Sequence, residues 1–382
     1  MSAVSKAPWK VPLADVQVTE DDIEAVAETY RSGWLSQGPR TREFEQAIEQ
    51  YTGAPHAIAM TNCTAALHLM ALAAGLGPGD EAIVPSLTFV ATANAIAYTG
   101  ATPVFADVVS LTEPWLDPEA VAKRITPRTK AIVCMQYGGH PGETLALRAL
   151  AAEHGLILLE DSAHAIGTRI GDEHAGTLGF AGAYSFFSNK NLAVGEGGMV
   201  VCRDEETAEK LRLLRSHGMT TLSWQRHQGH AASYDVVALG FNFRIDEARS
   251  ALGTNRLARL DGENRQRAAI DAHYRELLAD VPHVTAALAP PEGSTLAHHL
   301  FTVVLGDGVD RDAVRERLSA SGVQSSIHYP PAHWFEIYSG AGDVLPVTEE
   351  YARRTLTLPM YGHMTHEQTE LVVSALDAAC SE

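Results

Sequence analysis

The segment Leu156–Gly167, "LILLEDSAHAIG", joins a short apolar run to two acidic residues. A run that is apolar throughout is typical of a strand covered on both faces, as in a parallel sheet. The run ends at Asp161, and sheets of this kind bind ligands at the carboxyl ends of their strands. This segment therefore predicts an α/β fold with a functional site at one edge of the sheet.

Further apolar runs lie on both sides of this segment and alternate with helical patterns. We expect strands at residues 81–85, 102–108, 130–136, 156–161, 183–187 and 198–202. Crossover helices are expected at residues 63–75, 92–100, 117–125 and 143–155, and amphipathic helices at 21–33 and 40–53. Such alternation predicts a mostly parallel sheet with helices on both faces.

The C-terminal part of the chain has a different pattern. A long helical pattern runs from Asp246 to about Asp280, and a smaller set of strands and helices begins at residues 300–307. We therefore predict a large domain over residues 1–255, including the N-terminal segment, and a smaller C-terminal α+β domain over residues 256–382.

Composition narrows the functional classes. The chain has 382 residues, 46% of them apolar, and a formal net charge of −18, which argues against a nucleic-acid or membrane-surface binder. Its four cysteines lie far apart, so we expect no disulfide framework and no metal site. The sequence shows no secretory signal and no apolar run near the roughly 18 residues of a membrane span, so a soluble, unprocessed, cytoplasmic protein is expected.

Lys190 lies in the charge-poor segment Ser185–Val200, "SFFSNKNLAVGEGGMV". Burial lowers the pKa of a lysine, and the neutral amine is a nucleophile. The alternative is a lysine at a turn that reaches solvent through its long stem.

Asp161, at the end of its expected strand, also allows two interpretations. A carboxylate there is costly unless a cation lies against it, and a protonated pyridine nitrogen is such a cation. The alternative is that Asp161 caps a helix beginning at "SAHA".

Two further strand ends carry candidate ligand contacts. Thr61, Asn62 and Thr64 precede or begin a helix, whose N-terminus can bind a phosphate; an ordinary helix cap is the alternative. Phe89 follows another strand and can stack on a flat heterocycle, although a lone phenylalanine is often a core residue.

Together these features describe a planar, phosphorylated ligand with a basic ring nitrogen and an aldehyde. Pyridoxal 5′-phosphate meets each requirement, with Lys190 attacking the aldehyde and Asp161 keeping the ring nitrogen protonated.

Four motifs in order resemble the DegT/DnrJ/EryC1/StrS aminotransferases, which act mostly on nucleotide-linked keto-sugars. They are "GWLSQGP" (33–39), "EDSAHAIG" (160–167), "SFFSNKNLAVGEGG" (185–198) and "GFNFRIDE" (240–247). The resemblance covers nearly the whole chain. It implies the fold-type I architecture of pyridoxal phosphate enzymes and a homodimer with active sites at the subunit interface.

The resemblance also implies roles for individual residues. Lys190 matches the family's Schiff-base lysine, and Asp161 matches the partner of the pyridinium. The other implied cofactor contacts are Ser185, Cys63 and Thr64 at the phosphate, Phe89 stacked on the ring, His164 where many members carry glutamine, and Asn242 reaching the partner subunit's cofactor phosphate. The implied substrate contacts are Trp34 and Ser36 in one loop and His328 and Tyr329 in "HYPPAHW".

The expected reaction moves an amino group from L-glutamate to a dTDP- or UDP-linked 4-keto-6-deoxy-hexose, most simply at carbon 4. A 3-keto-sugar or a cyclitol is the alternative substrate. The family's dehydratase branch carries histidine in place of the lysine, so Lys190 argues against it. A non-catalytic binding or regulatory protein of this fold is expected to lack Lys190 or Asp161, and both are present.

Overall fold

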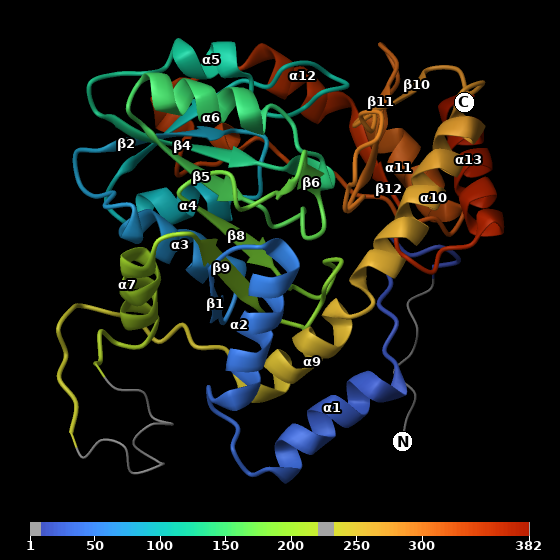
Figure 1. The fold of residues 1–382 in the computed structure, drawn as a ribbon. Coiled ribbons are helices and arrows are strands. Elements are labelled where there is room, and N and C mark those ends of the chain that lie inside the picture. The colour runs from blue at the N-terminus through green and yellow to red at the C-terminus, as the bar shows by residue number, and fades with distance from the viewer. Residues whose placement is uncertain (1–8, 221–232, 382) are drawn as a thin grey trace.

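The computed structural model describes residues 9–220 and 233–381 (Figure 1). Its centre is a seven-stranded sheet in the order β1-β9-β8-β5-β4-β2-β3, in which β9 runs antiparallel to β1 and β8 and the other neighbours pair in parallel. The strands are β1 (His56–Met60), β2 (Glu81–Pro85), β3 (Thr102–Ala106), β4 (Thr129–Met135), β5 (Ile157–Asp161), β8 (Ala181–Ser185) and β9 (Gly198–Cys202). The predicted mostly parallel sheet is confirmed.

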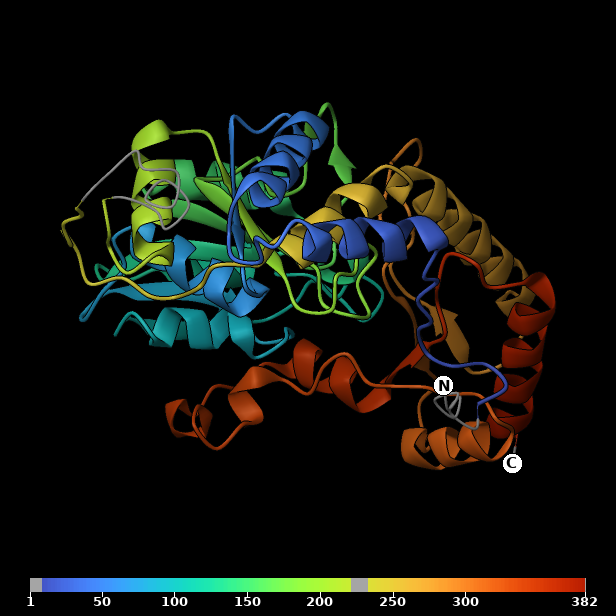
Figure 2. The same ribbon diagram turned by 90° about the horizontal axis from the view of Figure 1, so that it is seen from below.

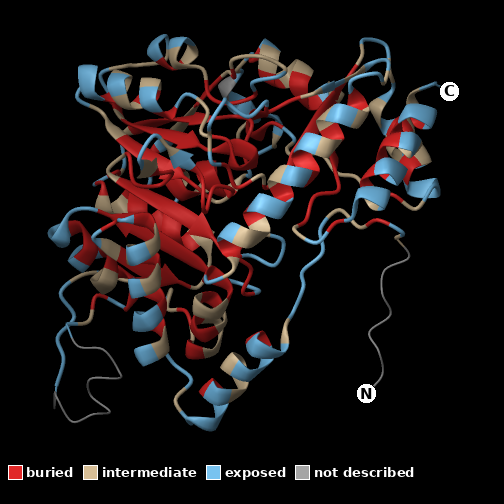
Figure 3. Cartoon of the chain, turned by 45° about the vertical axis from the view of Figure 1, so that its right-hand side comes forward, coloured by how far each residue is buried: buried red, intermediate tan, exposed pale blue. Residues whose placement is uncertain are grey.

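Helices cover both faces of this sheet. Alternate side chains of a strand point to opposite faces, and in β1 Ile58 and Met60 join one core cluster while Ala57 and Ala59 join another. On the first face lie α3 (Cys63–Ala73), α4 (Ala91–Ala97) and α7 (Glu205–Arg215); on the second lie α2 (Pro39–Thr52), α5 (Pro118–Ala122) and α6 (Thr144–Glu153). The strands are accordingly almost wholly buried (Figure 3).

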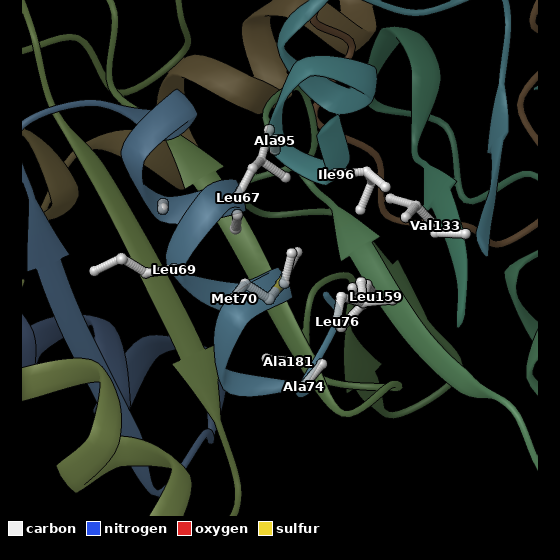
Figure 4. Close-up of a cluster of buried hydrophobic side chains, with 14 of the residues drawn as sticks. Leu67, Leu69, Met70, Ala74, Leu76, Ala95, Ile96, Val133, Leu159 and Ala181 are labelled. Carbon is white, nitrogen blue, oxygen red and sulfur yellow. The ribbon is translucent and has the colours of Figure 1, made fainter. Parts of the chain in front are cut away.

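The core cluster on the first face shows what holds the helices to the sheet. Leu67 and Met70 of α3 belong to one buried cluster with Val133 and Leu159 of the strands (Figure 4). Burying each such side chain contributes about 1.5–3 kcal/mol. This packing fixes the N-terminus of α3 beside the carboxyl edge of the sheet.

A second, smaller sheet forms the C-terminal region. It contains β10 (Val284–Ala286), β11 (Phe301–Leu305) and β12 (Thr355–Leu358), all antiparallel. It shares a core with the helices α10 (Leu260–Leu278), α11 (Arg311–Ala320) and α13 (His366–Ser381), which lie at one end of the molecule (Figure 2). The remaining elements are α12 (Pro346–Arg354), the short strands β6 (Arg169–Ile170) and β7 (Glu173–His174), and the 3-10 turns Tyr137–Gly139, Ala332–Trp334 and Ser339–Ala341.

The long helix expected from Asp246 to about Asp280 is two helices. α9 (Glu247–Leu257) ends before α10 begins at Leu260, although no glycine or proline lies between them. At the break, buried Asp22 of α1 (Glu20–Arg31) binds Arg256 at 3.3 Å and Arg259 at 2.7 Å, and α9 packs against α1 and α2. A domain boundary at residue 255 stays a prediction. Val11, which the prediction assigns to the large domain, packs in the core of the small sheet.

Within residues 9–220 and 233–381, no helix combines the length and apolar character that crossing a bilayer requires.

Candidate active site

A cavity of about 870 Å³ opens at the carboxyl edge of the large sheet. Its wall includes the last residues of β4, β5 and β8, which are Met135, Asp161 and Ser185. The predicted site residues that line it are Cys63, Thr64, Phe89, Asp161, His164, Ser185, Lys190, His328 and Tyr329. Most of the predicted site is therefore brought together in one place.

Three predicted residues do not line this cavity in the described part of the single chain. The indole Nε1 of Trp34 donates to the carbonyl of Gln37 at 3.4 Å, and Ser36 and Asn242 are exposed. Their proposed contacts with substrate or with a partner subunit stay predictions.

Lys190 occupies the loop after β8 and reaches the cavity wall. Burial is the largest effect on its amine and lowers the pKa to about 8, while the nearby Cys63 and Asp161 oppose this shift. Near pH 8 the amine is therefore about half neutral, and a neutral amine is nucleophilic. The structure favours this interpretation over a lysine that simply reaches solvent, because Lys190 lines the cavity and its Nζ lies 3.4 Å from Nε2 of buried His299.

Asp161 is buried at the end of β5. Its Oδ2 accepts a hydrogen bond from Thr92 Oγ1 at 2.6 Å, and its Oδ1 accepts from the amide of Ala163 at 3.1 Å. Burial raises the pKa of the carboxyl, and these two bonds oppose the rise. The alternative of a helix cap is wrong, since residues 162–168 form turns.

The start of α3 also lines the cavity, at Cys63 and Thr64. Asn62 caps the helix by accepting from the amide of Ala65 at 2.8 Å, which leaves the amides of Cys63 and Thr64 without an intrahelical acceptor. β9 approaches this turn closely, because a Cβ at Gly198 would lie 2.5 Å from backbone atoms of Asn62. Two amides and the helix dipole therefore face the cavity as an anion site.

Aromatic side chains line the remaining wall. His164 Nδ1 accepts from the amide of Gly138 at 3.2 Å, and burial lowers the pKa of this histidine well below its usual value. The neutral ring then carries its proton on Nε2 and donates to the hydroxyl of Tyr329, 2.9 Å away. Phe89 is 54% exposed and lies 5.9 Å from the Tyr329 ring, so its alternative as a core residue is wrong.

Sequence patterns missed several residues beside the predicted ones. Thr92 binds Asp161 from α4, and His299 lies 3.4 Å from the amine of Lys190. The available signal for His299 was a pair of histidines immediately before an apolar strand. Nothing local in the sequence distinguishes it from an ordinary core histidine.

Residues 16–377 match the model of the DegT/DnrJ/EryC1/StrS aminotransferase family. The chain belongs to this family. A curated relative, the spore coat polysaccharide biosynthesis protein SpsC of Bacillus subtilis (strain 168), is 38% identical over 378 residues, which cover 97% of this chain and 96% of SpsC. The predicted family is confirmed.

Solved structures of the family share the whole fold. S. venezuelae DesV in complex with a ketimine intermediate is 36% identical, with a TM-score of 0.90 over 98% of this chain and 100% of DesV. DesI in the presence of its TDP-sugar product is 35% identical, with a TM-score of 0.88 over 98% of this chain and 93% of DesI. The predicted fold of pyridoxal phosphate-dependent aminotransferases is confirmed.

This DegT/DnrJ/EryC1/StrS family member is thus a sugar aminotransferase that uses pyridoxal 5′-phosphate. The residues of the cavity fit that cofactor. Buried Asp161 has spare acceptor capacity for a cation, the amine of Lys190 has a lowered pKa, and the amides at the start of α3 offer an anion site.

Proposed function

We propose that this aminotransferase moves the amino group of L-glutamate to carbon 4 of a nucleotide-linked 4-keto-6-deoxy-hexose. The family assignment supports a sugar substrate, and the TDP-sugar bound to the relative DesI supports a nucleotide-linked one. The cavity of about 870 Å³ is large for an enzyme pocket, since such pockets span roughly 300–1,000 Å³, and it has room for more than a cofactor.

The observation that carries the proposal is the presence, in one cavity, of a lysine with a pKa of about 8 and a buried carboxylate bound to neutral partners. Lys190 and Asp161 would hold the cofactor at its aldehyde and its ring nitrogen. Ser185 with the amides of Cys63 and Thr64 would bind the phosphate, and Phe89 and His164 would contact the ring.

When bound, pyridoxal phosphate supplies an electrophilic carbon and a ring that accepts an electron pair. Asp161 would keep the ring nitrogen protonated, because a buried carboxylate stabilises an adjacent cation. Lys190 would bind the cofactor at its aldehyde carbon and would move a proton at the substrate carbon, for which a pKa near the working pH is suited. His328 and Tyr329 line the same cavity and would contact the sugar, with Trp34 and Ser36 at its border.

The reaction is tested by product analysis. The enzyme is incubated with nitrogen-15 L-glutamate and a panel of dTDP- and UDP-linked 4-keto-6-deoxy-hexoses, 3-keto-hexoses and a cyclitol ketone. We expect nitrogen-15 at carbon 4 of a 4-keto-6-deoxy-hexose, located by mass spectrometry and NMR, and none with Lys190→Ala. An amine at carbon 3, or reaction with the cyclitol alone, would overturn the proposed substrate.

We further propose a homodimer in which Asn242 reaches the cofactor phosphate of the other subunit. Asn242 is exposed in the single chain, so its side chain is accessible to a second copy. Mixing inactive Lys190→Ala chains with inactive Asn242→Asp chains places both lesions in one site of a mixed dimer and none in the other. Activity should recover in part after subunit exchange, and no recovery despite proven exchange contradicts a shared site.

A further inference from the structure

A chain of buried hydrogen bonds ends on the amine of Lys190. Asn264 Nδ2 of α10 donates to the carbonyl of Ile166 at 3.2 Å, and Asn191 Nδ2 donates to Asn264 Oδ1 at 2.8 Å. His299 Nδ1 lies 2.9 Å from Asn191 Oδ1, and His299 Nε2 lies 3.4 Å from Lys190 Nζ. The side chains of Asn191, Asn264 and His299 are all buried.

The donors and acceptors along this chain have one consistent direction. The amide nitrogen of Asn191 is identified by its two acceptors, Asn264 Oδ1 and the carbonyl of Ala297 at 2.6 Å. Asn191 Oδ1 must then accept, so His299 carries its proton on Nδ1. His299 Nε2 is left as an acceptor, and the amine of Lys190 donates to it.

The backbone around His299 is held in place on both sides. His298 has a φ of 46°, an uncommon conformation for a residue other than glycine, and its ring lies 3.4 Å from Asp271. The amide of His299 donates to the carbonyl of Gly138 at 2.9 Å, and the amide of Ala297 donates to Thr168 Oγ1 at 3.0 Å. This segment therefore presents the ring of His299 to Lys190 in a fixed orientation.

We propose that His299 is a positioning residue for Lys190, held in its acceptor tautomer by Asn191 and Asn264. His299 contacts Lys190 but is not among the described residues that line the cavity. This inference rests on the proposed function, because orienting the amine matters to the reaction only if Lys190 carries it.

A neutral hydrogen-bond acceptor is suited to orienting the amine of Lys190. A carboxylate in the place of His299 would hold the lysine as an ammonium ion and raise its pKa. Burial lowers the pKa of His299 well below its usual value, so the ring stays neutral and orients the amine without adding a charge. Other titratable groups line the two cavities that Lys190 lines. They include Cys63, Asp161, His164, Glu196, His328 and Tyr329 around the large cavity, and Asp15, Arg256, Glu263, Arg267 and His363 around a smaller one.

The test measures the pKa of Lys190 in the cofactor-free protein. The rate of its acetylation by acetic anhydride is followed against pH by mass spectrometry of the peptide that contains residue 190. His299→Asn keeps an amide for Asn191 but is too short to reach the lysine. Because the ammonium loses an acceptor, we expect the pKa of Lys190 to fall by about 1. His299→Gln, which can offer an amide oxygen to the lysine, should restore the wild-type value.

His174→Gln is the matched control, since His174 is also buried but binds Arg169 at 2.9 Å. It should leave the pKa of Lys190 unchanged. If His299→Asn does not fold, Asn191→Ser releases the ring of His299 and should lower the pKa in the same direction. An unchanged pKa in the folded protein, with either variant, overturns the inference.

In the cofactor-loaded enzyme we expect His299→Asn to lower kcat about tenfold with little change in KM for the sugar nucleotide. A change in KM alone would overturn the positioning role. Failure of the proposed function has different signatures: an amine at carbon 3 or reaction with the cyclitol alone would overturn the substrate, and turnover by Lys190→Ala would overturn the role of the lysine. The pKa comparison uses neither cofactor nor substrate and so does not depend on that result.

Discussion

Two adjacent carboxylates at the end of β5 have opposite surroundings, although both are buried. Consecutive side chains of a strand point to opposite faces, so Glu160 and Asp161 cannot share partners. Glu160 accepts four hydrogen bonds, from the amides of Gly176, Leu178 and Gly179 at 2.7 Å each and from Gln136 Nε2 at 2.9 Å. These bonds hold the turn that leads into β8.

Asp161 faces the cavity and accepts bonds from Thr92 and Ala163. Burial raises the pKa of both carboxyls, so the pKa alone does not separate them. The difference lies in unused acceptor capacity. A buried carboxylate that has filled its capacity holds the fold, and one that has not is available to a bound cation.

The largest expected effect is on the cavity side. Lys190→Ala should lower transamination at least 10⁴-fold, because the nucleophile and the proton-transfer group are lost together. Circular dichroism should show an unchanged fold, and Lys123→Ala, at an exposed lysine of α5's C-terminus, should keep full activity. Substantial turnover by Lys190→Ala would contradict the role of this residue.

Asp161→Asn tests the carboxylate with spare capacity. Removing its charge lets the ring nitrogen lose its proton, and a loss of two pKa units corresponds to roughly 10²-fold in rate. We expect kcat to fall by about this factor, while urea unfolding of the cofactor-free protein shows little loss of stability. The amide of Ala163 keeps an oxygen acceptor, and the hydroxyl of Thr92 can rotate to accept from the new amide nitrogen. Near-wild-type rates would mean that Asp161 only holds the turn.

Glu160→Gln should lower stability and leave activity largely unchanged, which is the reverse of the result expected for Asp161→Asn. The new amide nitrogen cannot accept from the backbone amides that Glu160 binds, which leaves buried donors unpaired. We expect the free energy of unfolding to fall by about 3 kcal/mol in urea unfolding, with kcat per folded molecule within a factor of a few of wild type. A stable but inactive variant would contradict the division of roles between the two carboxylates.

The smallest expected effect is the dependence of stability on pH. The pKa of Lys190 is about 8 in the folded protein and 10.5 in the unfolded chain, so between these values the unfolded chain binds more protons. Stability from this group therefore rises with pH across that window. From pH 8 to pH 10 the cofactor-free wild type should gain about 2 kcal/mol relative to Lys190→Met in urea unfolding at constant ionic strength. If the free energy of unfolding changes with pH in the same way in the two proteins, the lysine is not desolvated in the folded state.

Much of this fold could be predicted because its signals are local. An apolar run of five or six residues followed by a helical pattern identifies a strand and its crossover helix, and β5 and β9 begin and end within one residue of their expected bounds. The positions of Asp161 and Lys190 after such runs also predicted the cavity, because parallel strands end at a common edge. These features depend on neighbours in the sequence.

The tertiary structure alone decided what depends on distant partners. At the break between α9 and α10, Arg256 and Arg259 bind Asp22, more than 200 positions earlier in the chain. The residues after Asp161 form turns and not the helix that their sequence allows, and their side chains bind distant partners: Ser162 Oγ donates to Gln136 Oε1 at 2.8 Å, and Thr168 Oγ1 donates to the carbonyl of Gly139 at 2.6 Å. His299 and Asn264 meet Lys190 and Asn191 only when the C-terminal region packs against the large sheet. Periodicity records which face of an element is apolar, but it does not record which buried polar groups will find each other.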